Sequence, residues 1–366
     1  MLVSHSAQPG GSNQTIASLL RHRPSDLEAE CVFLEDGPAV DQVASLGLAA
    51  RVIESGRARE AWRAPQVVRA LSRAIDQAGA EIVFAHVTKA HLYASPAAKL
   101  GGLPYLWWQH ERRSQKPVMH LVSAWLPSSA VICSSRWTAA QQRRPRGGEV
   151  RAIYPGAELD PPPEAHLHSA GPGGQITVGV VGRLQRWKRV ELALRTWPAV
   201  LEGLPGARLR VVGAGWPGLD EGYGDELRAE AQRLGIAGSV DFTGHVPDVH
   251  RELAQIDVLL HTAQAEPFGL VLVEAMAHAI PVVAVDEGGP AEIVRSGVDG
   301  LLTPAQTAPL AAAVLELARD PARRAQMGAV GRERALGEFG APRMADETWA
   351  LVRRLLATRP PPRRLS

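Results

Sequence analysis

The sequence predicts an α/β protein of two domains, each built on a parallel sheet covered by helices. Its 366 residues suit two domains of ordinary size. Short apolar runs alternate with segments of helical periodicity in both halves, which is the pattern of parallel strands joined by helices. Residues 155–174, between the halves, are rich in proline and glycine and lack periodicity, as expected of a linker.

The composition is typical of a soluble globular protein. Hydrophobic residues make up 45% of the chain and the formal net charge is +2, which argues against a disordered chain. No apolar run approaches the ~20 residues of a membrane-spanning helix, and the N-terminus lacks the features of a secretion signal. Cys31 and Cys133 are too few for a disulfide framework or a four-thiolate zinc site. We therefore expect a cytoplasmic protein.

Charge is uneven between residues 112 and 151. Basic residues dominate this segment, against Glu149 alone; they are Arg112, Arg113, Lys116, Arg136, Arg143, Arg144, Arg146 and Arg151. They could form a solvated surface. The alternative is a surface that attracts an anionic acceptor or an anionic membrane, at the inner face of the plasma membrane. Nucleic acid is not expected, because no nucleic-acid-binding signature accompanies the charge.

In the first half we expect strands at residues 1–5, 31–34, 81–86, 104–109 and 130–133, and helices ending near residues 20, 46 and 100. An apolar stripe at helical spacing predicts a further core-facing helix; it consists of Trp62, Val67, Val68, Leu71, Ile75 and Ala78. Gly10 and Gly11 follow the first strand, and Ser12 or Asn13 is a suitable N-cap for the next helix. Two such glycines let backbone amides approach a phosphate.

The second half repeats the pattern. Strands are expected at 175–181, 207–212, 240–242, 258–261 and 281–285, and helices at 190–201, 225–234, 270–279, 309–319, 322–339 and 344–356. A glycine pattern from Val211 to Gly218 resembles a dinucleotide fingerprint. We set a nicotinamide site aside, because Pro217 and the loop after it delay the next helix to about Asp225.

Residues 262–290 carry two carboxylates in a loop, helix, strand and loop. Glu266 lies in the first loop, Glu274 lies on the helix that begins near Leu270, and a second glycine-rich turn follows the strand. This order places two helix N-termini and two acids together, as in a site for a phosphate-bearing ligand. Arg183 and Lys188, just after another strand, offer a fork and a point charge for a diphosphate. Surface ion pairs are the alternative for these two cations.

The second half carries a set of features at fixed positions: Arg183, Lys188, the Glu266/Glu274 pair with PFG between them, and the runs PVVA and GGPAEIV. This set resembles the retaining glycosyltransferases of family 4. The first half fits through HSAQPGGSNQ, LPYLWWQHE, VICSSRWTAAQ and AIYPG. The resemblance implies the GT-B fold, two facing Rossmann-like domains with the active site in the cleft. We expect an acceptor domain at 1–160, a linker at 161–174, a donor domain at 175–343, a helix at about 344–358 packing back on the first domain, and a disordered tail at 359–366.

The resemblance implies transfer of a sugar from a nucleotide-diphosphate sugar, a UDP-sugar first and a GDP-sugar next, to an acceptor hydroxyl. Glu266 would bind the donor sugar, Glu274 the ribose, and His110 would lie near the anomeric centre. The remaining donor-binding residues would be Gly10, Gly11, Arg183, Lys188, Val246, Phe268, Gly269, Leu270 and Val271. The acceptor would be a glycan, a lipid-linked sugar or a small aglycone, in cell-surface glycan or glycosylated-metabolite biosynthesis.

Two positions depart from the family pattern: Arg189 and Ala279 stand where glycine is usual. No Asp-x-Asp metal motif is present, so we expect no strict metal requirement and no tightly bound cofactor; arginine, lysine and helix termini would neutralise the leaving group. A nucleotide-sugar epimerase or hydrolase of the same fold, and a non-catalytic nucleotide-sugar-binding partner protein, stay open as alternatives.

Overall fold

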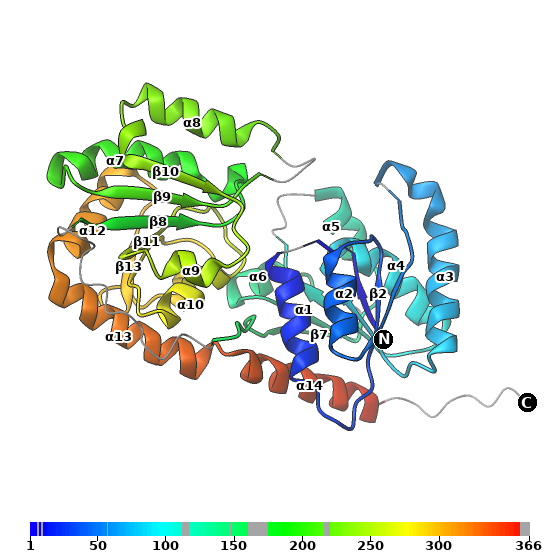
Figure 1. The fold of residues 1–366 in the computed structure, drawn as a ribbon. Helices are drawn as coiled ribbons and strands as arrows, with labels where there is room; N and C mark the ends of the chain where they lie inside the picture. The colour runs from blue at the N-terminus through cyan, green and yellow to red at the C-terminus, as the bar shows by residue number, and fades with distance from the viewer. Residues whose placement is uncertain are drawn as a thin grey trace, which may run out of the picture. The chain divides into compact units, whose positions relative to one another are not determined.

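The computed structural model of the chain describes residues 1–5, 7–8, 10–56, 58–111, 117–145, 148–159, 175–215 and 220–358 (Figure 1). The chain divides into two compact units. The first contains Met1–Glu158 and Ala341–Ser366, and the second contains Leu159–Gly340. The expected linker at 161–174 and the expected tail at 359–366 lie outside the described residues.

The first unit is a parallel seven-stranded sheet in the order β3-β2-β1-β4-β5-β6-β7. Its strands are β1 (Leu2–Ser4), β2 (Glu30–Phe33), β3 (Ala49–Val52), β4 (Val83–His86), β5 (Tyr105–Gln109), β6 (Ala130–Cys133) and β7 (Glu149–Ala152). Its helices are α1 (Gly11–Arg21), α2 (Pro38–Ser45), η1 (Ala58–Arg63), α3 (Ala64–Gln77), α4 (Val87–Leu100), α5 (Pro117–Ser123), α6 (Arg136–Gln141) and α14 (Ala341–Ala357).

Both faces of this sheet are covered by helices, and successive strand residues point to opposite faces. Trp107 packs in the cluster that α3 and α4 complete, and its neighbour Trp108 packs in the cluster that α1, α2 and α14 complete. The chain returns to this unit through α14. There the Trp349 Nε1–H donates to the Leu19 carbonyl at 3.1 Å and the Gly156 N–H donates to Met344 Sδ at 3.0 Å.

Two expectations for this unit are wrong. Trp62 is 70% exposed and lies in η1, whereas Val67, Leu71 and Ile75 of the same stripe are buried in α3. Trp62 belongs to the separate 3-10 helix η1, and α3 begins only at Ala64, so Trp62 does not share the helical phase of the stripe. The N-cap of α1 is Gly10, with Ser12 and Asn13 already inside the helix. Strands β3 and β7 and helix α5 were not predicted.

The second unit is a parallel six-stranded sheet in the order β10-β9-β8-β11-β12-β13. Its strands are β8 (Thr177–Val181), β9 (Arg208–Val212), β10 (Val240–Gly244), β11 (Val258–His261), β12 (Val282–Val285) and β13 (Gly300–Thr303). Its helical elements are η3 (Arg186–Lys188), α7 (Val190–Gly203), α8 (Tyr223–Arg233), η4 (Ala237–Ser239), α9 (Val249–Leu253), α10 (Leu270–Ala277), α11 (Pro290–Ile293), α12 (Thr307–Arg319) and α13 (Pro321–Glu338).

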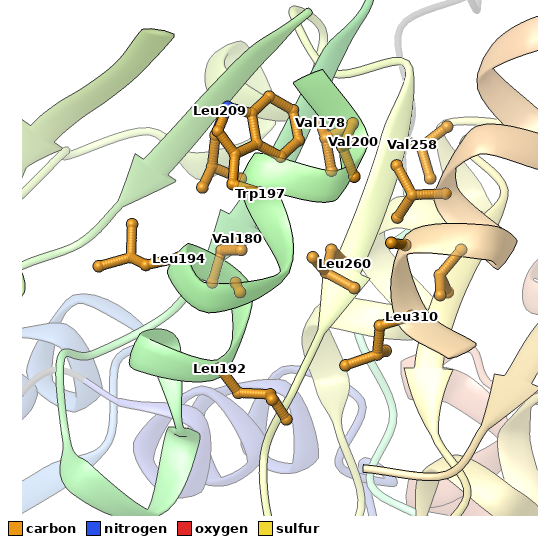
Figure 2. Close-up of a cluster of buried hydrophobic side chains, with 14 of the residues drawn as sticks. Val178, Val180, Leu192, Leu194, Trp197, Val200, Leu209, Val258, Leu260 and Leu310 are labelled. Atoms are coloured by element: carbon orange, nitrogen blue, oxygen red, sulfur yellow. The ribbon is translucent and has the colours of Figure 1, made fainter. Parts of the chain in front are cut away.

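The core of the second unit is built around Trp197 of α7, which is fully buried (Figure 2). Its ring packs with Val178 and Leu209 of the sheet, and its Nε1–H donates to Ser239 Oγ at 3.0 Å. Each sheet reverses its strand order once, between β1 and β4 in the first unit and between β8 and β11 in the second. Ligands of open α/β sheets bind at the carboxyl ends of strands beside such a reversal.

Helices α10 and α13 pack closely because of one glycine. A Cβ atom on Gly328 of α13 would collide with the Ala279 carbonyl, while a Cβ atom on Gly337 of the same helix would meet nothing within 4 Å. Ala279 is in the left-handed region at φ 57°, the conformation that favours glycine. The departure from the family pattern at this position therefore carries a backbone cost of about 1 kcal/mol.

Gly328→Ala and Gly337→Ala should change stability in opposite directions. We expect Gly328→Ala to destabilise the second unit by about 1–3 kcal/mol, because overpacking must push α13 away from Ala279. We expect Gly337→Ala to leave stability unchanged or raise it by up to about 1 kcal/mol, because alanine is the better helix former. Urea unfolding measures both. Equal effects would contradict the close packing of these helices.

Candidate functional site

The carboxyl ends of β8 and β11 bring three charged or titratable side chains together. Lys188 Nζ lies 2.5 Å from Glu266 Oε2, and His261 Nε2 lies 3.3 Å from the same oxygen. Glu266 and His261 are buried. Burial would raise the pKa of Glu266, but the Lys188 charge and the His261 contact outweigh it and hold this pKa at about 2. The cluster therefore contains a permanently ionised carboxylate.

The loop that carries Lys188 is clamped to the loop that carries Glu266. Thr262 Oγ1 donates to the carbonyls of Lys188 at 3.0 Å and Arg189 at 2.9 Å, and the Gln264 N–H donates to the Trp187 carbonyl at 2.9 Å. The Lys188 ammonium also lies 4.3 Å from the centre of the Trp187 ring. These contacts hold the Lys188 ammonium against the Glu266 carboxylate.

Arg189 is the second departure from the family pattern, and it is left-handed at φ 53°. The residue after Lys188 must turn back into α7, and glycine would do so without strain. Arg183, two residues beyond β8, is exposed and lines a small pocket with Lys188 and His261. The pocket thus has two cations on the β8 side.

The second glycine-rich turn, at Gly288 and Gly289, lies directly against the loop that carries Glu266. The Gly289 N–H donates to the Glu266 carbonyl at 2.8 Å. A Cβ atom on Gly288 would lie 2.5 Å from that same carbonyl, and one on Gly289 would collide with the Phe268 backbone. Both glycines are therefore required for close approach of the two loops.

Helix α10 begins directly after the acid loop. Gly269 is its N-cap in a left-handed conformation at φ 111°, and the amides of Leu270 and Val271 belong to its first turn, where no intrahelical acceptor exists. The Phe268 side chain is buried, with its ring 6.0 Å from that of Phe339 in an edge contact. Phe268 therefore packs in the core, and its backbone is what lies beside the helix start.

Glu274 lies on α10 with only 9% of its surface exposed. Burial raises the pKa of Glu274 to about 7. Among the described residues, no donor bonds its carboxylate. The two acids of the stretch thus have opposite electrostatics, since Glu266 has a cationic partner and Glu274 has none.

The glycines of the dinucleotide-like pattern have a packing role. A Cβ atom on Gly213 would collide with the Gly182 carbonyl, and the Gly213 N–H donates to the Gly244 carbonyl at 3.0 Å. Helix α8 begins at Tyr223, well after the pattern. The starts of the loops after β8, β9 and β10 therefore lie side by side. Val246 lies two residues beyond the end of β10.

The first unit contributes His110, which follows β5. Its Nε2 lies 3.2 Å from His86 Nδ1 and its Nδ1 lies 3.2 Å from Ser134 Oγ. Burial lowers the pKa of His110 to about 3, so the ring is neutral at physiological pH. Gly10 and Gly11 lie at the start of α1, where the Gly10 carbonyl accepts the first helical hydrogen bonds.

Of the expected site residues, the structure brings Arg183, Lys188 and Glu266 into one cluster of the second unit. The α10 residues and Val246 belong to the same unit, whereas His110, Gly10 and Gly11 belong to the first unit. No role was predicted for His261, whereas the Gly288–Gly289 turn was predicted to precede a second helix N-terminus, and α11 begins there at Pro290. The signal for His261 was its place at the end of a buried strand next to the site.

No group of three or more His, Cys, Asp and Glu side chains in the described ranges could hold a metal ion. Likewise, none of the helices within the described part of the chain combines the length and apolar character that a membrane crossing requires.

Two family models match the chain, one in each half. Residues 9–161 match the model described as Glycosyltransferase Family 4, and residues 164–334 match the model described as Glycosyl transferases group 1. The structure is also similar to that of Anabaena Alr3699/HepE in complex with UDP and glucose. That likeness has a TM-score of 0.80 at 23% identity over 96% of this chain and 98% of the other.

Curated relatives match at the sequence level. The D-inositol 3-phosphate glycosyltransferase of Rhodococcus erythropolis is 34% identical over 49% of this chain and 43% of its own length. The match to this relative thus spans less than half of its length. The alpha-maltose-1-phosphate synthase of Mycolicibacterium smegmatis is 29% identical over 76% of this chain and 80% of its own length.

The opposite electrostatics of the two acids predict opposite effects of pH. The pKa of Glu274 is raised, so its contribution to stability is full below pH 4.5 and is lost as pH rises through 7. We expect Glu274→Gln to remove this loss and to stabilise the protein at pH 8 by up to about 3 kcal/mol relative to wild type. Urea unfolding at pH 5 and pH 8 measures the difference.

Glu266→Gln is the matched control. The pKa of Glu266 is lowered, so its contribution is present above pH 4.5 and is lost as pH falls toward 2. This variant should destabilise the protein at pH 7, because Lys188 loses its partner. The same sign for both variants at neutral to alkaline pH would contradict the assignment.

Proposed function

The chain belongs to glycosyltransferase family 4 and has the GT-B fold, and on this basis we propose that it is a retaining glycosyltransferase. In the proposed reaction an acceptor hydroxyl oxygen forms a bond to the anomeric carbon of a nucleotide-diphosphate sugar. The bond from that carbon to the phosphate oxygen breaks on the same face, and the leaving phosphate takes the acceptor's proton. Neither glutamate acts as a covalent nucleophile.

The observation that carries this proposal is the charged cluster at the ends of β8 and β11. Transfer increases the negative charge on the departing diphosphate, so catalysis needs fixed positive groups where it leaves. Lys188 is held in place by Glu266 and Thr262, and Arg183 lines the same small pocket. The first amides of α10 add partial positive charge at the same edge of the sheet.

Glu266 is suited to bind the donor sugar. Its contacts with Lys188 and His261 both use Oε2, which leaves Oε1 to accept a hydrogen bond from a sugar hydroxyl. Because the carboxylate stays ionised, that hydrogen bond would be charge-assisted. His110 would position the sugar near its anomeric carbon, and Gly10 and Gly11 would approach the diphosphate from the first unit.

Glu274 is suited to bind the ribose. A buried carboxyl without a described partner is costly for the free protein, and a pair of ribose hydroxyls would supply the missing donors. Val246, beyond the end of β10, would contact the base. A UDP-sugar is the favoured donor and a GDP-sugar is next, and the UDP and glucose bound by Anabaena Alr3699/HepE support this order.

We propose that turnover does not depend on a metal ion, because Arg183, Lys188 and the start of α10 supply the positive charge that a metal would otherwise provide. Activity that survives EDTA treatment would agree with metal-independent turnover, and activity restored only by added Mg²⁺ or Mn²⁺ would overturn it.

We propose that the donor domain is residues 175–343 and that the acceptor domain is residues 1–160.

The proposed function is tested with purified protein and a panel of nucleotide diphosphates and their sugars. We expect one diphosphate to bind, and Arg183→Ala and Lys188→Ala each to weaken its binding about 10- to 100-fold, the value of a charge-assisted hydrogen bond. Titration calorimetry measures the affinity. With acceptor present, NMR of the product should show the anomeric configuration of the donor.

Arg186→Ala is the matched control for those variants. Arg186 lies in η3 beside Lys188, but its guanidinium bonds Glu226 at 2.6 Å and stacks on Tyr223 at 5.1 Å. Its loss should change nucleotide affinity little. Unchanged affinity in the other two variants, or no turnover of any donor, would overturn the proposal. Nucleotide release at the same rate without acceptor would indicate a hydrolase.

We also propose that the acceptor side works at an anionic membrane, at the cytoplasmic face. Leu121, Val122 and Trp125, on and just after α5, are 56%, 50% and 65% exposed. The Arg143 guanidinium lies 5.4 Å from the centre of the Trp125 ring, and Arg144 is exposed beside it. Aromatic and apolar groups next to arginine suit the interface of an anionic bilayer. Arg112, Arg113, Lys116 and Arg146 lie outside the described residues.

Trp125→Ala and Arg143→Ala should each reduce binding to vesicles that contain anionic lipid. Insertion of the indole and attraction of the guanidinium both contribute, the latter about 1 kcal/mol, or fivefold in affinity. Co-sedimentation at low and high salt measures it. Trp62→Ala, which removes another exposed tryptophan, is the control and should have no effect. Binding to neutral vesicles alone, or none, would contradict the proposal.

A further inference from the structure

His86 is a second histidine beside His110, and the sequence assigned it no role. It is the last residue of β4, and β4 pairs with β5 so that His86 lies opposite Trp108. Its side chain is fully buried. The two imidazoles are nearly coplanar, with ring centres 5.3 Å apart and an angle of 19° between them. This geometry directs one ring nitrogen of each toward the other.

Both ring nitrogens of His110 are occupied within the first unit. Nε2 faces His86 Nδ1 at 3.2 Å, and Nδ1 faces Ser134 Oγ at 3.2 Å. Ser134 Oγ also lies 3.4 Å from the Gln109 carbonyl, to which it can only donate. If the hydroxyl proton goes to Gln109, Ser134 Oγ must accept the proton on His110 Nδ1.

The other end of this row of hydrogen bonds, at His86, favours the same direction of proton donation. His86 Nε2 is buried without a hydrogen-bond partner among the described residues. A buried N–H without an acceptor is rarer than a buried acceptor without a donor, so Nε2 is the bare nitrogen. His86 then carries its proton on Nδ1 and donates it to His110 Nε2. The protons run from His86 to His110, to Ser134 and to the Gln109 carbonyl.

The backbone around His86 is held in a strained state. Val87, the next residue, has φ 62°, a left-handed conformation that a β-branched residue almost never adopts. The Thr88 N–H donates to Glu111 Oε2 at 3.0 Å, so the residue after His110 secures this turn. Strain of this kind persists where the surrounding structure maintains it, and it clusters at functional sites.

We propose that His86 is a positioning residue for the reaction, which fixes the ring orientation and the tautomer of His110. His110 is thereby held as a neutral imidazole with its proton on Nδ1 and its Nε2 turned to His86. Burial lowers the pKa of both rings, which agrees with this neutral pair. The charged groups on the adjoining turn are engaged elsewhere: Glu111 with Thr88 N, and Lys89 with the Gly56 carbonyl at 2.8 Å.

With both nitrogens occupied, a neutral and fixed His110 would orient a donor sugar through contact with its ring and would not transfer a proton. This agrees with a mechanism in which the leaving phosphate takes the proton. The inference rests on the proposed glycosyltransferase function for its kinetic consequence. Its structural content, the tautomer and neutrality of His110, does not depend on turnover.

The test compares His86→Leu with His86→Asn, two substitutions of nearly equal size. Asparagine can still donate an N–H near the position of Nδ1, and leucine cannot. We expect His86→Leu to lower kcat/KM about 10- to 100-fold, as when a reacting group is misplaced, and His86→Asn to retain most of it. Thermal unfolding of both variants separates a loss of fold from a loss of positioning.

Nitrogen-15 NMR of histidine-labelled protein gives the second measurement, with His110→Gln to assign the signal. In the wild type, His110 should be protonated on Nδ1 and should not titrate between pH 5 and pH 8. His86→Leu should change the tautomer or raise the pKa of His110, and His86→Asn should not. His91→Leu, at a buried histidine bonded instead to Tyr105 and Ser123, should leave the His110 signal unchanged.

The inference would be overturned by a wild-type His110 that titrates between pH 5 and pH 8 or is protonated on Nε2. It would also be overturned by leucine and asparagine variants with the same activity and the same His110 signal. A protein that transfers no sugar yet shows the predicted NMR response would overturn the proposed function and leave the tautomer assignment standing.

Discussion

The pairing of one buried carboxylate, Glu266, is the interaction on which the second unit's site depends. A carboxylate taken out of water costs several kcal/mol unless a cation and hydrogen bonds compensate it. Lys188 is that cation, and it can reach Glu266 only if the loops after β8 and β11 lie against each other. Thr262 holds them together, and Gly288 and Gly289 let a third loop close over the acid. Each of these residues serves the same requirement for close, well-paired approach.

Glu274 shows that two acids eight residues apart can have opposite properties. Helix α10 carries it into the core-like side of the site, where burial raises its pKa and no described cation faces it. Glu266 is thus an ionised carboxylate already paired with a lysine, whereas Glu274 is a buried carboxyl that no described donor bonds. The donor that we propose, a nucleotide sugar, would bring a diphosphate to the cations and hydroxyls to the two acids.

The two units hold different kinds of polar cluster at the carboxyl ends of their strands. The second unit gathers charge at its strand ends and stabilises it by pairing. The first unit places His86, His110 and Ser134 in sequence within hydrogen-bond distance, and burial lowers the pKa of both rings. Val87 and Ala279 mark where the backbone is strained beside these groups.

The sequence by itself determined the fold class and all the described strands except β3, β7 and β13, because alternation is a local property of the chain. It also singled out Arg183, Lys188, Glu266 and Glu274 as candidates, because motif spacing is local too. It misplaced Trp62, because the change from the 3-10 helix η1 to the α-helix α3 at Ala64 alters the helical phase without changing the pattern of apolar residues. Only the tertiary structure decided that His261 faces Glu266, that His86 faces His110, and that no donor among the described residues bonds the Glu274 carboxylate. Those contacts depend on which strand ends are neighbours, and strand order follows from the packing of the whole sheet.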